Sequence, residues 1–461
     1  MMSPNEDALN WKTTHWLPYP LPADYTVVND PWIRPEQVPT SFVGVNVVDV
    51  EGETVLKNMT VKIRKGKFES IAPTGDNDIA DEKHMVVDAT GLFMCPGLID
   101  CHAHVTAVPV KSEGLSFLHD NETALKSTWV LRGMLLRGFT TARDVGGATR
   151  HYKDATENWV IPGPRLFICG GPLLSQTGGH GDISGRDDPL PCSCSRQRGE
   201  SMGWTADGVD ECLKKARKLM MMGADHIKIA ASGGVLSDTE TLTATQFTIP
   251  EMKAIVQTVD QMEGTMVTAH CFTTKAARAA IEAGVRGIEH GSLIDIPTLK
   301  LMAEKGVFLT PTLIVSDAIA RPPYDKMTTP YQHEKVQHVV KESYEMLKNA
   351  HEAGVCIGYG TDCFGILHPN QLAEFDLRKK VLPSPAILKQ ATINAAKMLR
   401  MEGKLGIIKL GAFADFLLLS ASPLEDVGIL NRPRQHFKGI LKDGRCVFSR
   451  LSGLPVEVSI E

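Results

Sequence analysis

The sequence predicts an α/β protein: a (β/α)₈ TIM barrel with a small β-sandwich domain formed from both chain ends. Apolar, strand-like runs alternate with helical runs through the middle of the chain, which is typical of a parallel sheet covered by helices. Short strands separated by turn residues occur near both chain ends instead. A doubly wound sheet is the alternative for the middle region, but no glycine-rich fingerprint follows its first strand.

The length of the chain predicts more than one domain. At 461 residues it exceeds the size at which a single hydrophobic core stops growing. We predict an N-terminal extension (1–40), a β-sandwich domain (41–95 and 405–455) and a barrel (96–404). The predicted sandwich strands are Ser41–Val50, Thr60–Lys65, Lys67–Ile71, Met85–Asp88, Asp415–Leu419, His436–Lys442 and Arg445–Phe448.

Eight apolar runs in the middle region fit the strands of a (β/α)₈ barrel. They are Gly97–His104, Thr140–Val145, Arg165–Cys169, His226–Ala231, Thr265–His270, Gly287–His290, Phe308–Leu313 and Cys356–Asp362. The helical runs between them include Asp207–Met222, Ile249–Glu263, Ala276–Ala283, Ile296–Lys305 and Lys335–Ala353.

Composition and charge are those of an ordinary soluble protein, with 43% hydrophobic residues, 22% charged residues and a net charge of −5. No basic run indicates a nucleic acid or an anionic membrane as a partner, and no stretch is apolar enough to span a bilayer. The N-terminus does not resemble a signal peptide, so we expect a cytoplasmic protein with mostly reduced cysteines. Cys192 and Cys194 are interpreted as incidental loop thiols rather than a metal or redox site, because no second ligand pair follows at a suitable spacing.

Polar residues stand at the ends of the predicted barrel strands. His102 and His104 are two apart in the first strand, so their side chains point to the same side and can bind one metal ion. Later strands end in His270, His290 and Asp362. In a barrel the C-terminal strand ends face one mouth, where active sites lie in this fold. An isolated histidine pair would be explained equally well by surface or core histidines, but the convergence of all these residues predicts a metal centre.

Lys228 stands among apolar neighbours in the strand His226–Ala231. A protonated lysine cannot bind a metal ion, and its burial beside cations costs several kcal/mol. A lysine that has reacted with carbon dioxide is a carbamate, whose two oxygens can bridge two ions. The alternative is a lysine paired with a nearby acid at the barrel mouth, and the residues alone do not decide between the two.

Several motifs together resemble the amidohydrolase superfamily. Within it they are most similar to the branch of binuclear metal-dependent Xaa-Pro dipeptidases and related carboxypeptidases, which includes an ochratoxin-hydrolysing amidase. The similarity runs from about residue 42 to about residue 450. The motifs that carry it are Asp100–His104, His226–Val235, Ala269-His270, Glu289-His290-Gly291 and Gly360-Thr361-Asp362.

This resemblance implies two divalent metal ions, with zinc as the expected metal, bridged by carbamylated Lys228. It implies that His102, His104 and Asp362 hold one ion and that His270 and His290 hold the other. In such a centre a metal-bridging hydroxide attacks the substrate carbonyl. Asp362 would then be both a ligand and the catalytic group that moves the proton to the leaving amine.

The resemblance also indicates residues that contact the substrate. The segment Leu174–Asp182 is similar to a loop of this branch in which His180 points into the site and hydrogen-bonds the reacting oxygen. The alternative is that His180 only stabilises a glycine-rich turn. Residues 183–204 form a long polar stretch of a kind that often sets specificity over a barrel mouth, although surface filler or an oligomer contact would explain it as well.

Phe272 and Arg278 occupy positions where relatives often have a tyrosine and an arginine that receive the substrate's free carboxylate. Arg278 matches and would bind a carboxylate bidentately, or it is simply a solvated helix residue. Phe272 departs from the pattern, because it lacks the hydroxyl and leaves a more apolar surface. This departure casts doubt on ordinary dipeptide cleavage.

The predicted function is therefore hydrolysis of an amide bond in a small molecule, such as an N-acyl amino acid, a dipeptide or an amide-containing secondary metabolite. A decarboxylase, lactonase or deaminase on the same metal-dependent barrel is the alternative, and a non-catalytic binding protein is a further one. By analogy with relatives we expect a homo-oligomer.

Overall fold

The structure is a computed structural model that describes residues 36–75, 84–108, 118–181, 203–238 and 240–458. Most of the predicted N-terminal extension, the pair Cys192 and Cys194, and most of the polar stretch 183–204 lie outside these residues. No helix in the described part of the chain is both long and apolar enough to cross a bilayer. The strands are β1 (Thr40–Asp49), β2 (Thr54–Arg64), β3 (Lys67–Pro73), β4 (Met85–Asp88), β5 (Phe93–Pro96), β6 (Leu98–Ala103), β7 (Phe139–Asp144), β8 (Arg165–Ile168), β9 (Leu173–Ser175), β10 (Gly203–Thr205), β11 (Ile227–Ala230), β12 (Val267–Thr273), β13 (Gly287–Leu293), β14 (Phe308–Thr310), β15 (Phe416–Leu419), β16 (Phe437–Lys442) and β17 (Arg445–Ser449).

Helices fill the segments between the strands of the middle region and follow the last of them. They are α2 (Asp120–Leu136), α3 (Arg150–Glu157), α4 (Val209–Met221), α5 (Ile249–Gln261), α6 (Thr274–Glu282), α7 (Ile296–Lys305), α8 (Leu313–Ile319), α9 (Pro330–Glu352), α10 (Ala373–Arg378), α11 (Ser384–Gln390), α12 (Ile393–Met398) and α13 (Pro433–His436), with the 3₁₀ turns η5 (Tyr324–Met327), η6 (Gly365–Asn370) and η7 (Val427–Asn431).

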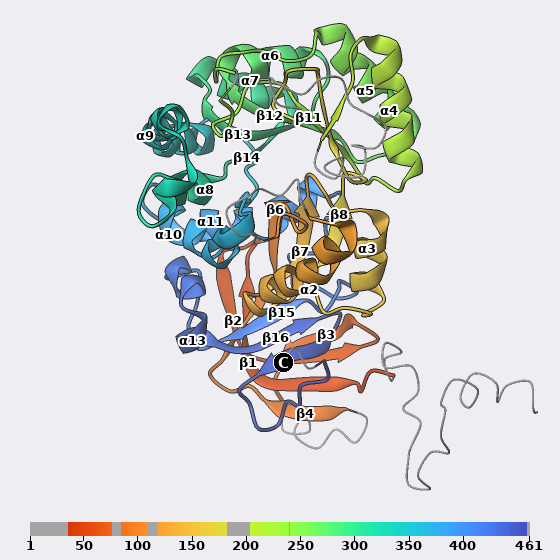
Figure 1. Cartoon of the computed structure of the whole chain (residues 1–461). Helices are drawn as coiled ribbons and strands as arrows, with labels where there is room; N and C mark the ends of the chain where they lie inside the picture. The colour runs from red at the N-terminus through yellow and green to blue at the C-terminus, as the bar shows by residue number, and fades with distance from the viewer. Residues whose placement is uncertain (1–35, 76–83, 109–117, 182–202, 239, 459–461) are drawn as a thin grey trace, which may run out of the picture.

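Strands from both chain ends form one sheet, drawn in red and blue at one end of the molecule in Figure 1. Its order is β17-β16-β15-β5-β1-β2-β3, with β4 also paired to β1. The junction is β5, which pairs parallel to β1 and antiparallel to β15. The two ends therefore pair with each other as predicted, but the hydrogen bonds describe one sheet and do not divide it into the two layers of a sandwich.

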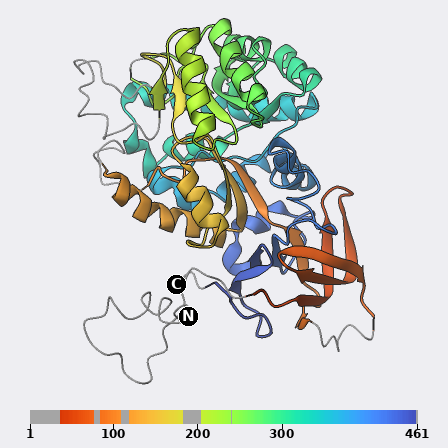
Figure 2. The same cartoon turned by 90° about the vertical axis from the view of Figure 1, so that its right-hand side faces the viewer.

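Apolar side chains from both chain ends fill the core of this sheet. Phe42, Phe68 and Phe416 are almost fully buried there. The rings of Phe42 and Phe416 meet edge to face, with centroids 5.2 Å apart, an arrangement that aromatic pairs favour. Figure 2 shows from a second side that the N-terminal and C-terminal strands lie side by side. Phe42 and Phe416 are more than 370 positions apart in sequence, so this core packs the N-terminal strands against the C-terminal strands.

The middle region contains two parallel sheets, β6-β7-β8 and β10-β9-β11-β12-β13-β14, with helices around them (Figure 1). Every described pairing within these two sheets is parallel. The predicted α/β content and the parallel arrangement are thus confirmed. No continuous ladder joins the two sheets among the described residues, and the pairing by itself does not describe a closed barrel.

A few backbone hydrogen bonds connect the two sheets on each side. On one side the Asp225 amide donates to the Ile168 carbonyl at 2.8 Å. On the other, the segment 356–362 bonds to both neighbours: the Cys101 amide donates to the Tyr359 carbonyl at 2.7 Å, and the Leu309 amide donates to the Cys356 carbonyl at 3.1 Å. This segment was predicted as the eighth strand, but it forms only an isolated bridge between Ile357 and Leu309 and no strand ladder.

The predicted helix Lys335–Ala353 begins earlier than expected, at Pro330. Thr329 precedes it and forms a capping box with Gln332, and Pro330 takes the first helical position, where its missing amide hydrogen costs nothing. The early part was missed because its residues are polar and lack the apolar periodicity of the later turns.

A buried histidine predicts one pH effect on stability. His368 donates from Nε2 to the Ala107 carbonyl at 2.9 Å, and burial lowers its pKa from 6.5 to about 4. Between these two values the unfolded chain binds a proton that the folded chain does not, so stability falls as the pH falls. We expect the free energy of unfolding of the native protein to fall relative to that of His368→Gln by up to about 3 kcal/mol as the pH drops from 7.5 to 4.5, so that the two thermal midpoints approach each other. Midpoint curves that stay parallel across this range would contradict the expectation.

Candidate metal centre

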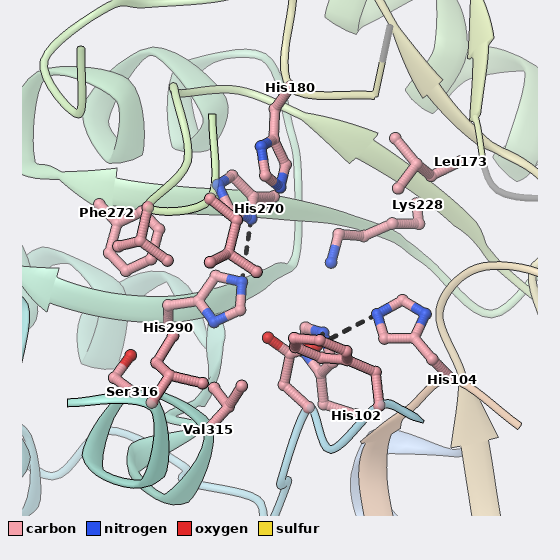
Figure 3. A pocket seen from close by; sticks show the side chains of 15 residues that line it. His102, His104, Leu173, His180, Lys228, His270, Phe272, His290, Val315 and Ser316 are labelled. Atoms are coloured by element: carbon pink, nitrogen blue, oxygen red, sulfur yellow. Dashed lines mark hydrogen bonds and ion pairs between the residues drawn. The ribbon is translucent and has the colours of Figure 1, made fainter. Parts of the chain in front are cut away.

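A pocket of about 560 Å³, counting its open mouth, lies at the C-terminal ends of the parallel strands (Figure 3). The pocket brings together all six predicted metal ligands as well as His180 and Phe272. Its lining residues are His102, His104, Leu173, His180, Lys228, Val235, Leu236, His270, Phe272, His290, Val315, Ser316, Ile319, Asp362 and Phe364.

The first group of candidate ligands is His102, His104 and Asp362. Nε2 of His102 lies 3.3 Å from Oδ1 of Asp362, and Nε2 of His104 lies 3.2 Å from the same oxygen. The two histidines come from β6 and its end, two residues apart as the strand period requires. Asp362 comes from the segment that follows Tyr359 on the neighbouring side.

Asp100 explains why Asp362 lies beside β6. The fully buried Asp100 carboxylate accepts hydrogen bonds from the amide and hydroxyl of Thr361, at 3.2 and 2.7 Å. The Asp362 amide then donates to the His102 carbonyl at 2.8 Å. Asp362 adopts a left-handed backbone with φ 54°, which is costly for a residue with a Cβ and is held here by these bonds. Asp100, the first residue of the Asp100–His104 motif, therefore helps to position Asp362.

The second group is His270 on β12 and His290 on β13. Nδ1 of His270 and Nε2 of His290 face each other at 3.0 Å (Figure 3). His290 also has a left-handed backbone, with φ 68°, and the register between β12 and β13 shifts just beyond it. This local irregularity turns the His290 side chain toward the pocket. Strained backbone of this kind occurs more often at functional sites than elsewhere.

These distances fit shared metal ions. Two atoms bound about 2.1 Å from one tetrahedral zinc ion lie about 3.4 Å apart. The nitrogen–oxygen distances of 3.2 and 3.3 Å in the first group are close to that value. Ligand atoms of His102, His290 and Asp362 also lie within 4.8 Å of one another, so the two groups border a common space. Neutral imidazole and carboxylate are the donor types that zinc and similar ions prefer.

Hydrogen bonds to the outer ring nitrogens orient the histidines. Nδ1 of His102 bonds to the Glu289 carboxylate at 2.7 Å, and Nδ1 of His104 donates to the Gly146 carbonyl at 2.9 Å. Nε2 of His270 donates to the Gly233 carbonyl at 3.3 Å. Carbonyl and carboxylate oxygens only accept, so each bond assigns a ring proton to the nitrogen that faces away from the pocket. In the neutral ring the nitrogen that faces the pocket then has a free lone pair, as in metal-bound histidines.

The charge states suit metal binding. Burial lowers the pKa of His270 and His290 well below 6.5, so both rings are neutral at pH 7. Burial opposes ionisation of Asp362, but the neighbouring His102 and His104 outweigh it and hold its pKa well below the usual value. The centre therefore offers neutral imidazoles at His270 and His290 and an ionised carboxylate at Asp362. Burial opposes protonation of His104, but the neighbouring Asp362 carboxylate raises its pKa.

Lys228 lies between the two groups of ligands. It is only 2% exposed, and in Figure 3 its side chain extends from β11 into the space between His104 and His290. Burial lowers the pKa of its ammonium group. The neutral amine is the form that reacts with carbon dioxide, so both the position and the environment of Lys228 are compatible with a bridging carbamate.

Glu289 and Arg143 support the centre and were not singled out from the sequence. Glu289 is fully buried and accepts from Arg143 at 2.5 Å as well as from the Thr268 hydroxyl. Burial opposes its ionisation, but Arg143 and His102 hold its pKa well below the usual value. Both residues carry a charge inside a predicted strand, Arg143 beside Asp144 and Glu289 beside His290. A buried charge needs a partner, which was the signal available in the sequence.

Glu289→Gln is expected to weaken metal binding by about tenfold to 100-fold, because the amide is a poorer acceptor for His102 and loses its charge pairing with Arg143. Equilibrium dialysis followed by elemental analysis measures this directly. An exposed carboxylate, Glu304 on α7, provides the matched control Glu304→Gln. Equal metal affinity of Glu289→Gln and the control would contradict the role.

His180 and Phe272 lie against the second ligand group. The His180 ring stacks on His270 with centroids 3.9 Å apart, and the Phe272 ring stacks on His290 at 4.9 Å. Phe272 is 2% exposed and presents no polar atom to the pocket. With Val315, Ile319 and the other aliphatic lining residues it makes the apolar wall of the pocket.

Arg278 is not brought to the pocket. It lies on an exposed face of α6, and its guanidinium donates to the Thr298 hydroxyl at 3.3 Å. Among the described residues, the lining therefore lacks both groups that were considered for a substrate carboxylate: the tyrosine hydroxyl is absent at Phe272, and Arg278 is directed elsewhere. The expectation that Arg278 receives a carboxylate is corrected accordingly.

Comparison with known proteins agrees with this geometry. Residues 93–448 match the Amidohydrolase family, which confirms the resemblance read from the motifs. Ochratoxinase from Aspergillus niger is 29% identical over 362 residues, covering 74% of this chain and 73% of the enzyme.

Two solved structures extend the likeness over most of the fold. The structure of an amidohydrolase is 37% identical, with a TM-score of 0.85, and covers 90% of this chain and 100% of its own. The structure of a prolidase complexed with N-methylphosphonate-L-proline is 36% identical, with a TM-score of 0.83, and covers 89% of this chain and 100% of its own.

Proposed function

Because this chain belongs to the amidohydrolase family and is a hydrolase, we propose that it cleaves an amide bond of a small molecule at a binuclear metal centre. The observation that carries the proposal is the convergence of His102, His104 and Asp362 on one side of Lys228 and of His270 and His290 on the other. This arrangement supports two adjacent ions with carbamylated Lys228 between them.

The residues present fit the proposed ions, because four histidines and the ionised Asp362 carboxylate line one space. His102, His104 and Asp362 would hold one ion, His270 and His290 the other, and zinc is the proposed metal. When bound, such ions polarise a substrate carbonyl and lower the pKa of a water molecule.

The protein's own groups supply the remaining chemistry. The Asp362 carboxylate accepts the proton of the attacking water and returns it to the leaving amine, which requires an ionised group at the start of the cycle. His180 points toward the same space and donates a hydrogen bond to the substrate oxygen as negative charge develops on it. The apolar wall excludes water and strengthens both interactions.

The proposed substrate carries an apolar group that packs on Phe272. Relatives include an ochratoxinase and a prolidase solved with N-methylphosphonate-L-proline, and we propose a substrate of a similar small-molecule class. N-acyl amino acids, dipeptides and amide-containing secondary metabolites all remain in this class. The described lining favours members whose side group is aromatic or branched.

Arg278→Met is expected to change KM by less than about twofold for a substrate with a free carboxylate and for its carboxamide alike, because Arg278 lies outside the described lining. Steady-state kinetics with one such pair of substrates measures this. A rise in KM of tenfold or more that is confined to the carboxylate would restore the carboxylate-binding role.

The proposed function is tested by incubating the metal-loaded protein with N-acyl amino acids, dipeptides, lactams, aromatic amides and, for the alternative, lactones. Stoichiometric appearance of an amine and a carboxylate is the expected result. Release of CO₂ without an amine would indicate a decarboxylase, ammonia a deaminase, and turnover of lactones alone a lactonase; each of these would overturn the amide-hydrolase proposal.

Several structural predictions remain proposals alongside the function. We propose that the eight middle segments close into a barrel through the bridging hydrogen bonds of residues 225 and 356–362, and that 41–95 and 405–455 form the second domain. The extension 1–40, assembly into a homo-oligomer and a cytoplasmic location stay predictions.

A further inference from the structure

A buried lysine fixes one wall of the pocket. Lys335 on α9 is 7% exposed, and its ammonium group donates to the carbonyls of Gly234, Ser237 and Glu240 at 2.8, 2.5 and 3.1 Å. An ammonium group has three N–H donors, so all three are used on one short segment of backbone. The Tyr331 ring lies 4.6 Å from the same nitrogen. Because all three N–H donors are hydrogen-bonded, the free-energy cost of burying the charged ammonium group is offset.

The segment that Lys335 binds touches His180 directly. A Cβ added at Gly234 would lie 2.1 Å from Cε1 and Nδ1 of the His180 ring, which is far inside contact distance. Only a glycine lets the backbone approach this closely. The position of the Gly234 peptide therefore limits where the His180 ring can lie.

Glu240 bonds to the amide nitrogen of the same glycine, Gly234. Its Oε1 accepts from the Gly234 amide at 3.3 Å and lies 3.4 Å from Nδ1 of His180. Its Oε2 accepts from Gln246 at 2.5 Å, and Gln246 in turn accepts from the His180 amide at 3.0 Å. The backbone of Gly234 is thus bonded through its carbonyl oxygen to Lys335 and through its amide nitrogen to Glu240, with the His180 ring packed against it.

The first turns of α9 add further bonds to this segment. Gln332 donates to the Leu236 carbonyl at 3.0 Å, and Thr329 donates to the Asp238 carboxylate at 2.7 Å. These are the turns that extend the helix beyond its predicted start. Val235 and Leu236, between the bonded residues, line the pocket. The start of α9 is therefore a rigid support for the pocket wall, and Lys335 is its most buried contact.

We propose that Lys335 is a positioning residue: through the Gly234 peptide it holds the His180 ring in its stacked place over His270, directed at the reacting substrate oxygen. This inference rests on the role of His180 in the proposed function. It does not place Lys335 in contact with the substrate. A lysine that only fastens α9 to the neighbouring segment would affect stability without acting through His180.

A double-mutant cycle separates these two roles. We expect His180→Ala to lower kcat about 100-fold and Lys335→Met about tenfold, with KM and metal content nearly unchanged in Lys335→Met. In the His180→Ala background Lys335→Met should change kcat by less than about twofold, because the group it positions is already gone. Lys335→Arg should recover part of the lost kcat, since it keeps the charge and several donors. Lys341→Met, an exposed lysine on the same helix, is the matched control and should behave as the native protein.

Independent effects of the two substitutions, which multiply to about 1,000-fold in the double variant, would overturn the proposal. If Lys335→Met does not fold, Gly234→Ala tests the same contact, and its loss of kcat should likewise vanish in the His180→Ala background. A crystal structure of either variant gives a readout that does not depend on activity: we expect the His180 ring to leave its stacked position over His270, and an unmoved ring would overturn the proposal. Absence of amine release by the native protein would instead overturn the proposed function.

Discussion

Asp362→Asn is expected to lower kcat by about three orders of magnitude or more, because it removes a metal ligand and the proton carrier in one change. The carboxylate is held ionised by His102 and His104 and is positioned by the Thr361–Asp100 bonds, so the amide keeps the shape of the site and loses its chemistry. Turnover of the best amide substrate and metal content per chain are measured together.

The control for this substitution is Asp260→Asn on the exposed face of α5, which should retain full activity. A drop in kcat of less than about tenfold in Asp362→Asn would contradict the assignment of proton transfer to this residue. A large drop with unchanged metal content would assign proton transfer to Asp362 and leave metal binding to the histidines.

Lys228→Met is expected to lose metal and to lower kcat by a similar factor, because the bridge between the two ligand groups disappears. Methionine has nearly the same length and remains compatible with a buried position, so the loss would not reflect a collapsed fold. Added short carboxylates such as formate or propionate should restore part of the activity by occupying the place of the carbamate. Native protein equilibrated with ¹³C-bicarbonate should give a carbamate signal in the carbon NMR spectrum.

Two results would contradict the role of Lys228. One is a native protein loaded with metal whose Lys228 amine is unmodified in a clear density map. The other is a Lys228→Met variant that keeps both its metal and its turnover. Lys253→Met on the exposed face of α5 serves as the control for the loss of a lysine side chain.

The candidate ligands could be predicted from two features of the sequence: the two-residue period of side chains along a strand, and the shared edge at which parallel strands end. His102 and His104 follow from alternation in one strand, and His270 and His290 follow from the shared mouth of parallel strands. The buried apolar runs also gave most of the middle strands and helices. These features depend on local patterns of side chains, which a single sequence displays directly.

Features that depend on tertiary contacts were not predictable in the same way. The segment 356–362 has the apolar pattern of a strand, but the Thr361–Asp100 bonds and the left-handed Asp362 end its pairing. The direction of the Arg278 side chain depends on Thr298, a residue of the next helix. The charge chain from Arg143 through Glu289 to His102 joins three strands, so the sequence shows its members only as charged or polar residues in separate strands, without their pairing.

The ion-binding centre is the central claim, and the most direct test is a metal titration of the chelated protein with an amide substrate present. We predict that removal of metal abolishes amine release, that zinc or a similar divalent ion restores it, and that full activity coincides with about two equivalents of metal per chain. Full turnover by a protein shown by elemental analysis to hold no metal would contradict the account.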